Sequence, residues 1–168
     1  MEKLSHKART RQRILDEAAL VMRESGTEGI GVAALMKRAG LTHGGFYAHF
    51  ASREALVDAV IAEMFADSAQ RFATITSLPD PAERLTQLID NYLSEHHRNN
   101  PGEGCPMPAL VSEIAHLPIE TRTLYSQRRH AVRPRLAPAL HELNHPPADE
   151  VAIRMLAAMV RAVALALA

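Results

Sequence analysis

The chain has 168 residues, of which 47% are hydrophobic, and its 19 basic and 19 acidic residues give a formal net charge of zero. The hydrophobic content is ample for a core, while the absence of Trp, the few aromatic residues and the abundant Ala and Leu favour an all-α fold over a β fold. The single cysteine excludes an internal disulfide, and the polar N-terminus excludes a signal peptide. Arg154 and Arg161 interrupt the apolar tail, so we expect a cytoplasmic protein without a membrane span.

The charge is distributed unevenly along the chain. Residues 1–56 carry nine Lys/Arg against six Asp/Glu, a net charge of +3, and the remainder carries −3. Many of the basic residues lie at the amino end, namely Lys3, Lys7, Arg9, Arg11 and Arg13. A flexible arm with this charge would reach DNA phosphates or a minor groove, and the alternative is an ordinary solvated basic tail.

The first two expected helices cover residues 10–25 and 32–39, each with apolar residues at helical spacing. Gly40 follows where a helix end favours a left-handed residue, and the hydroxyl of Thr42 is expected to cap the next helix. That helix, residues 43–50, should bury Phe46 and Phe50. Its two glycines each cost about 1 kcal/mol of helix stability relative to Ala, which indicates that its backbone approaches something closely. The pattern predicts a helix-turn-helix.

The rest of the chain is expected to be helical between proline-rich breaks. Ser52 should cap a long helix that runs to residue 77. Further helices are expected over residues 82–97, 107–116, 118–143 with kinks at Pro134 and Pro138, and 149–168, with a turn-rich loop over 99–108.

The N-terminal third resembles the TetR (tetracycline-repressor-type) family of transcriptional regulators, over about residues 8–60. The similarity is carried by Thr10-Arg11, Ile14-Leu15, Ala18-Ala19, Gly26, Val32, Leu35, Ala39 to Thr42, Gly44, Phe46-Tyr47, His49-Phe50, Ser52, Glu54 and Leu56. Gly31 and Arg53 depart from the residues that are usual in the family, a Ser or Thr cap and a Lys.

The resemblance implies an all-α protein with an N-terminal three-helix helix-turn-helix DNA-binding domain, residues 1–51. A helical ligand-binding and dimerisation domain, residues 52–168, should follow and end within the first of the family's last two helices. We therefore expect a homodimeric, sequence-specific regulator that binds double-stranded DNA at a palindromic operator. By the same resemblance it would be a repressor that an unidentified small-molecule effector releases. No motif for catalysis, a cofactor or a metal is present, so we do not expect an enzyme.

Three sets of site residues are predicted. The DNA surface is expected to comprise Thr42, His43, Gly44, Gly45, Tyr47, His49 and Arg53, with Thr42, Tyr47, His49 and Arg53 at phosphates and His43 and Gly45 near base edges. Glycines offer little side-chain readout, so DNA shape should contribute to specificity. The effector pocket implied by the resemblance is expected to draw on Met64, Tyr92, His96, Met107, Leu110, Tyr125 and Met159, although each is also a candidate core residue. The last helix is apolar on more than one face, which predicts dimer contacts at Leu156, Met159, Val160 and Val163.

Cys105 and the histidines leave alternatives open. Cys105 precedes a proline at the expected start of a helix, where a thiolate is favoured, so it is a candidate redox or electrophile sensor. The other interpretation is a small buried cysteine that seals the loop. The nine histidines show no metal-binding spacing. The alternative to a DNA-binding regulator is a helical ligand- or metal-binding protein whose DNA-binding head is vestigial.

Overall fold

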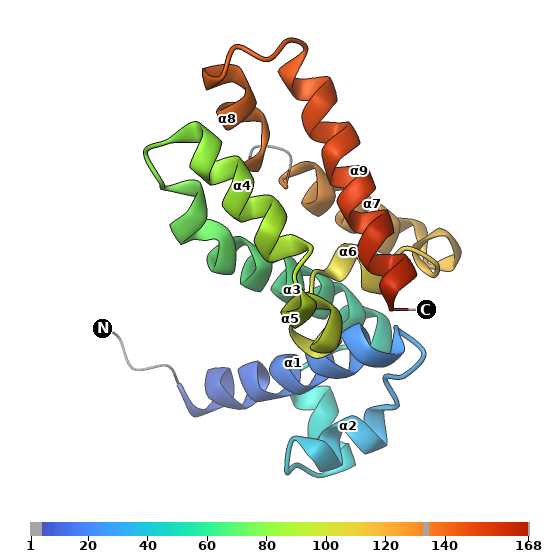
Figure 1. Cartoon of the computed structure of the whole chain (residues 1–168). Helices are drawn as coiled ribbons and strands as arrows, with labels where there is room; N and C mark the ends of the chain where they lie inside the picture. Colours follow the sequence, from blue (N-terminus) through green and yellow to red (C-terminus); the bar gives the residue numbers. More distant parts are fainter. Residues whose placement is uncertain (1–4, 133–134, 168) are drawn as a thin grey trace.

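The computed structural model describes residues 5–132 and 135–167, and it is all-helical over these residues (Figure 1). The elements are α1 (His6–Ser25), α2 (Val32–Arg38), the 3₁₀ helix η1 (His43–Ala48), α3 (Arg53–Thr76), α4 (Pro81–Tyr92), α5 (Glu95–Asn99), η2 (Pro101–Glu103), α6 (Pro106–Leu110), η3 (Ile114–His116), α7 (Ile119–His130), α8 (Ala137–Glu142) and α9 (Ala148–Ala166). The all-α expectation is confirmed. Within the described residues, none of these helices combines the length and hydrophobicity needed to cross a membrane.

The head, made of α1, α2 and η1, lies at one end of the molecule (Figure 1). Its turns follow the expected local chemistry. Gly40 has φ +67°, a left-handed conformation that suits glycine, directly after α2. The hydroxyl of Ser52 accepts a hydrogen bond from the Ala55 amide at 3.1 Å and so caps α3 as predicted.

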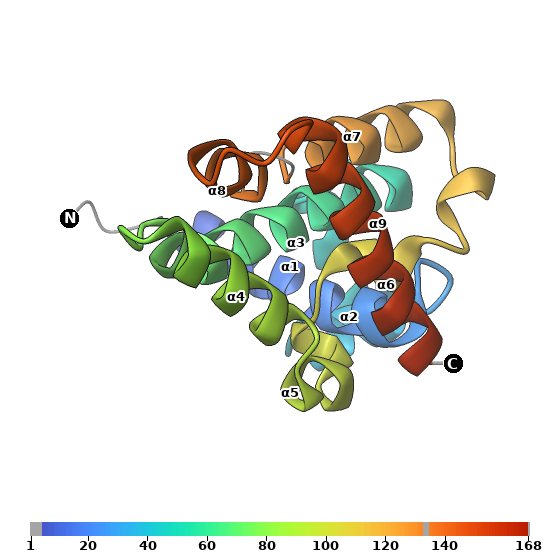
Figure 2. The same cartoon turned by 45° about the horizontal axis from the view of Figure 1, so that its top comes forward.

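The long helix α3 joins the head to the rest of the chain. Its side chains Leu56, Val60, Ile61 and Met64 have no exposed surface and belong to one hydrophobic cluster that also contains α1 residues. The same cluster takes in side chains from α6, α7 and α9. The head and the remaining helices, which we call the body, therefore share a continuous core arranged around α3 (Figure 2).

A second, smaller cluster joins α4, α8 and the first turns of α9 at the end of the body farthest from the head (Figure 1). Its buried members are Leu88, Leu136, Ala137, Leu140, Ala148 and Ala152. At the edge of this cluster, Arg84 of α4 forms an ion pair with Glu142 of α8 at 2.5 Å.

Several expected helices are shorter in the structure. The helix expected over residues 82–97 ends at Tyr92, because Ser94 caps a separate helix by accepting a hydrogen bond from the His97 amide at 3.1 Å. The helix expected over 107–116 is divided into α6 and η3. The helix expected over 118–143 ends at His130, and Pro138 lies in the first turn of a new helix, α8, where proline is tolerated. Pro134 lies outside the described residues.

Candidate functional site

The recognition segment η1 is a 3₁₀ helix over His43–Ala48, not the α-helix that was expected to reach Phe50. Two adjacent glycines give the segment low helix propensity, so its conformation depends on packing rather than on intrinsic preference. Phe46 and Phe50 provide that packing. Both are buried as predicted, and their rings stack at a centroid distance of 5.6 Å.

Tyr47 points away from this core. It is 68% exposed, whereas its neighbour Phe46 is 1% exposed, and the two rings meet edge to face at 5.3 Å. A large aromatic side chain is thus supported at its base by a buried ring while its hydroxyl is free to meet a partner.

Gly44 and Thr42, close to Tyr47 in the chain, are also exposed. A Cβ placed on Gly44 would have no atom within 4 Å, so nothing inside the described protein requires glycine there. The Thr42 side chain makes no capping hydrogen bond to η1 in this structure, which corrects the expected cap. Thr42 and His43 are exposed, and Gly45 is half-buried above Met36. The exposed groups of this segment thus include the Gly44 backbone, the Thr42 hydroxyl and the His43 imidazole.

His49 and Arg53, also predicted for this surface, are more enclosed. The Nδ1 atom of the half-buried His49 has no hydrogen-bond partner among the described residues. Arg53 donates to the Thr27 carbonyl at 2.6 Å and to the Ile30 carbonyl at 3.2 Å, and it lies 3.7 Å from the Glu28 carboxylate. Arg53 therefore ties α3 to the loop between α1 and α2, and a phosphate contact for it stays a prediction.

The basic amino end is mostly helical. Lys7, Arg9, Arg11 and Arg13 lie in the first turns of α1, which begins at His6, whereas a flexible arm was expected. The Arg11 guanidinium lies over the Phe50 ring, 4.8 Å from its centre. Lys3 lies outside the described residues.

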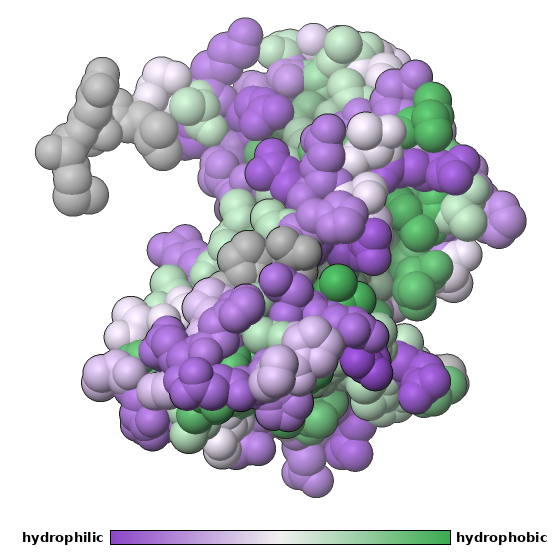
Figure 3. All heavy atoms as spheres, turned by 90° about the horizontal axis from the view of Figure 1, so that it is seen from above, coloured by the Kyte–Doolittle hydropathy of each residue, from purple (hydrophilic) through white to green (hydrophobic). Residues whose placement is uncertain are grey.

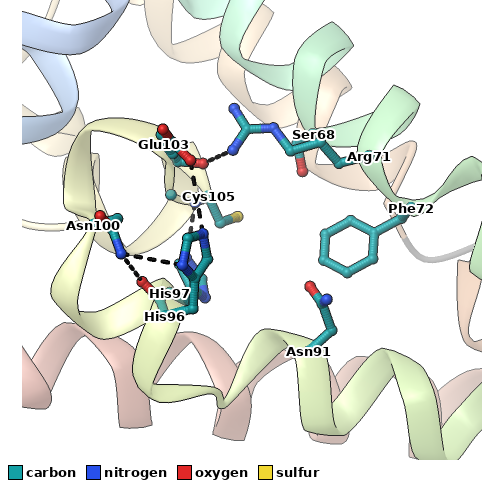
Figure 4. Close-up of a pocket in the computed structure, with 10 residues that line it drawn as sticks. Ser68, Arg71, Phe72, Asn91, His96, His97, Asn100, Glu103 and Cys105 are labelled. Carbon is teal, nitrogen blue, oxygen red and sulfur yellow. Dashed lines mark hydrogen bonds and ion pairs between the residues drawn. The ribbon is translucent and has the colours of Figure 1, made fainter.

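A polar chamber of about 310 Å³ opens between α3, α4 and the segment from α5 to Cys105 (Figure 4). Ser68, Arg71 and Phe72 approach from α3, Asn91 points in from α4, and the sulfur of Cys105 faces the same space. His96 and Glu103 form an ion pair at 3.7 Å at its margin. Of the predicted effector residues, His96 alone lines this chamber.

A narrow apolar crevice, with about 20 Å³ of free space, continues inward from the chamber and shares Ser68, Phe72 and Cys105 with it. Tyr92, Met107 and Met159 line it as predicted, together with Leu88, Val132, Arg135, Leu136 and Leu156. The other predicted residues lie elsewhere. Met64 and Leu110 are fully buried core residues that line neither space, and Tyr125 lines a separate groove.

Cys105 is buried and held by its backbone. Its amide donates to Nε2 of His97 at 2.9 Å, and Nδ1 of the same ring pairs with the Tyr92 carbonyl at 2.6 Å. Burial raises the pKa of the Cys105 thiol, although its contacts with the Tyr92 hydroxyl and the Met107 backbone and the charges of Arg135 and Arg23 oppose this shift. The raised pKa favours the neutral thiol over the thiolate that was expected at a helix start, and the sensor role of Cys105 stays a prediction.

An apolar groove of about 700 Å³ runs between α6, α7 and α9. Among the predicted dimer contacts, Leu156 and Val160 line it, while Met159 and Val163 are buried in the chain's own core. Ile153 and Leu165, which were not predicted, are exposed in the groove wall, and hydrophobic residues gather on this side of the surface (Figure 3).

Within the part of the chain that the structure describes, no three His, Cys, Asp or Glu side chains are gathered as metal ligands would be. The histidine pair His141 and His145 is separated by the end of α8, and His141 instead lies 3.5 Å from the Asp149 carboxylate.

Sequence reasoning missed the polar lining of the two internal spaces. Ser68, Arg71 and Phe72 lie near the end of the long helix α3, beyond the residues that resemble a known pattern, and Arg135 lies within the segment 118–143 that was expected to be one kinked helix. The sequence held one sign of this lining: Ser68, Arg71 and Phe72 are spaced i, i+3 and i+4, which places them on one face of a helix.

Comparison with known proteins adds to this geometry. Residues 14–60 match the family model described as bacterial regulatory proteins, tetR family. The chain is 29% identical over 113 residues to the HTH-type transcriptional repressor DhaR of Mycobacterium sp. (strain GP1), covering 67% of this chain and 56% of that protein. It is 31% identical over 87 residues to the A-factor receptor protein of Streptomyces griseus, covering 51% and 32% of the two chains.

The fold is shared with solved structures. The crystal structure of a TetR transcriptional regulator from Chloroflexus aurantiacus J-10-FL superposes with a TM-score of 0.83 and 24% identity, covering 95% of this chain and 85% of that one. The chain therefore has the architecture of these regulators, although it spans only 56% and 32% of the length of the two curated relatives.

Proposed function

We propose that the chain is a TetR-family regulator, a sequence-specific DNA-binding repressor that a small-molecule effector releases from its operator. The match of residues 14–60 to the tetR family model and the similarity to the repressor DhaR support this proposal. The protein acts without catalysis, as a homodimer, on double-stranded DNA in the cytoplasm. The two recognition segments of a dimer would read half-sites spaced by about one helical turn, roughly 34–36 Å, or a multiple of it.

The outer face of η1 is the observation that carries this proposal. Tyr47 is exposed and its ring packs against the buried ring of Phe46. Nearby in the chain, the backbone at Gly44 is unobstructed and can be approached closely from outside. Solvent exposure of most of the Tyr47 side chain and an open backbone at Gly44 are not required by the packing of the described protein. Tyr47, Thr42 and the amides at the start of η1 suit phosphate oxygens, and we expect His43 and Gly45 to approach base edges in a major groove.

Fluorescence anisotropy of the purified protein tests the proposal, with a labelled duplex from upstream of its own gene and a scrambled duplex of equal composition. Tight binding to the native duplex alone, with affinity that falls steeply as salt rises, is the expected result. Equal and weak binding to both duplexes would contradict a specific operator at that place. A panel of selected random duplexes would then identify any other preferred sequence, and failure to enrich one would overturn the proposal.

We assign the effector to the chamber and crevice, because these spaces lie between the long helix α3 and the helices that pack on it. An effector there would press on Ser68 and Phe72, and α3 would transmit the displacement to the head. A coupling of about 1–3 kcal/mol between the two sites would suffice for regulation. The buried neutral thiol of Cys105 favours ligand binding over thiol modification as the signal.

We assign the dimer contact to the groove wall on α9. Analytical ultracentrifugation of an Ile153→Glu variant tests this, with Leu93→Glu as the control because Leu93 is an exposed apolar residue between α4 and α5. We expect the first variant to sediment as a monomer and the second as a dimer. If both variants sediment as dimers, the interface lies elsewhere.

A further inference from the structure

We propose that the effector is a small organic carboxylate, whose anionic head binds Arg135, Ser68 and Tyr92 at the crevice while its apolar part lies in the chamber against Phe72. This inference rests on the proposed function, since it names the chemical class of the ligand that the chamber and crevice would take. Two side chains carry it independently of each other.

Arg135 is a half-buried cation that lacks an acidic partner among the described residues. Its Nη1 atom makes only two long hydrogen bonds, to the Ser68 hydroxyl at 3.3 Å and the Ser68 carbonyl at 3.5 Å. Its guanidinium lies over the Phe72 ring, 5.7 Å from the ring centre, and it lines the crevice. Burial lowers the pKa of Arg135, which is the mark of a charge held away from water without full compensation. A planar guanidinium in this position matches a carboxylate.

Tyr92 supplies the second observation. The residue is 96% buried and lines the same crevice as Arg135. Its hydroxyl has no oxygen or nitrogen partner among the described residues and lies beside the Cys105 thiol, which is a weak acceptor. A thiol satisfies a buried hydroxyl only weakly, so the hydroxyl at this point suits a stronger acceptor that arrives with a ligand. A carboxylate oxygen accepts from a phenol and a guanidinium at once.

The surrounding charges are compatible with an anion. The Asp67 carboxylate is paired with Arg23 at 3.2 Å, and the exposed Glu103 carboxylate lies 3.7 Å from Nε2 of His96. Arg71, which lines the chamber, donates to the Glu103 backbone carbonyl rather than to a carboxylate. Two arginines, Arg71 and Arg135, thus face the two spaces against one carboxylate, that of Glu103.

The size of the site limits the ligand. The chamber measures about 310 Å³, at the small end of ligand pockets, which span roughly 300–1,000 Å³. The crevice, with about 20 Å³ of free space, has room for little more than the carboxylate head, so a short aliphatic or aromatic tail would lie in the chamber on the Phe72 side. Hexanoate and benzoate are therefore suitable probes, with hexanamide and benzamide as neutral controls of nearly equal shape.

Isothermal titration of the full chain with these four compounds tests the proposal. We expect the carboxylates to bind at least about tenfold more tightly than their amides, because a charge-assisted pair is lost in the amide. Arg135→Gln should weaken carboxylate binding by a similar factor, and Tyr92→Phe by about fivefold. Arg128→Gln, which removes an exposed arginine of α7 that lines neither space, should leave affinity unchanged.

Three results would overturn the assignment. These are equal binding of amides and carboxylates, unchanged carboxylate affinity in both Arg135→Gln and Tyr92→Phe, and no carboxylate binding at concentrations that saturate a millimolar site. Circular dichroism shows whether Arg135→Gln is folded. If it is not folded, Tyr92→Phe, which keeps the packed ring, serves as the test variant. DNA anisotropy is measured separately on the same protein. Carboxylate binding without DNA binding would refute the proposed function alone, whereas DNA binding without carboxylate binding would refute this inference alone.

Discussion

Glu113, in the body, accepts two hydrogen bonds from Thr27, in the head: one from its amide at 2.8 Å and one from its hydroxyl at 2.7 Å, both to Oε2. Thr27 is itself 1% exposed, and its carbonyl accepts from Arg53 at the start of α3. The turn after α1 is therefore held from the body on one side and from α3 on the other. Besides the shared core, this carboxylate is a direct polar connection between the two parts.

Gly26 is confined by the same carboxylate. It has φ +68°, and a Cβ built on it would lie 1.7 Å from Glu113 Oε1. Gly40 has a similar φ, +67°, but no atom within 4 Å of its Cβ position, whereas the ψ of Gly26, −172°, places it in a region that is essentially restricted to glycine. We expect Gly40→Ala to lose about 1–2 kcal/mol of unfolding free energy from backbone strain. Gly26→Ala should lose a further 1.5–3 kcal/mol or so, because Glu113 must move away from Thr27.

Urea denaturation of both variants measures the difference. The part of the Gly26 penalty that comes from Glu113 should disappear in a Glu113→Ala background, as a double-mutant cycle would show, while the part from the backbone conformation remains. Equal losses in the two glycine variants, or a Gly26 penalty that is unchanged by removal of the carboxylate, would contradict this account.

Gly44 tests the contribution of an open backbone to DNA binding. Gly44→Ala should leave the unfolding free energy unchanged or raise it by up to about 1 kcal/mol, since the new methyl group meets nothing in the protein. Its operator affinity should fall about tenfold, or 1.4 kcal/mol, because the methyl group separates the backbone from DNA. Gly31→Ala is the matched control, since its Cβ is equally unobstructed but precedes α2. An equal effect of both substitutions on DNA affinity would argue against a close approach at Gly44.

Tyr47 tests whether the exposed aromatic contacts DNA. Tyr47→Phe keeps the ring on Phe46 and should cost about 1 kcal/mol of DNA binding, roughly fivefold in affinity, through the lost hydroxyl. Tyr47→Ala should cost more, while thermal unfolding changes little. Ile119→Ala, which removes a 61% exposed side chain on α7, serves as control and should bind DNA normally. Unchanged DNA affinity in Tyr47→Ala would favour a vestigial head.

Cys105 should react slowly with alkylating agents. Because burial raises its pKa, little thiolate is present at pH 7, and the rate with iodoacetamide should lie at least about tenfold below that of the unfolded chain. The rate should still be rising above pH 8.5, roughly the pKa of a free thiol. The same shift stabilises the fold fully below that pH, and this contribution is lost as pH rises through the folded value. A fast reaction at pH 7, abolished in Cys105→Ser together with peroxide sensitivity of DNA binding, would restore the sensor interpretation.

The sequence predicted the head better than the body, for a physical reason. Gly40, Ser52, Phe46 and Phe50 act through local rules of capping and periodicity, and all four are found as expected. The 3₁₀ conformation of η1 was not foreseen, because its form depends on packing rather than on helix propensity.

In the body, the important relationships join residues far apart in the chain. Ser68 meets Arg135 and Thr27 meets Glu113 across separations of 67 and 86 residues, which no periodicity within a single helix reveals. The apolar stripe of α9 was recognised, but its pattern did not distinguish side chains buried in the chain itself, such as Val163, from those in the open groove, such as Val160.

The shared core along α3 limits how this protein can be recombined with its relatives. Leu56, Val60, Ile61 and Met64 are packed by α1 from the head and by helices of the body. A chimera joined at residue 51 would place a foreign α1 against these four side chains and create cavities or clashes at the junction. Exchange of DNA specificity is better made on the outer face of η1 alone, where Thr42, His43 and Tyr47 can change without disturbing the interior.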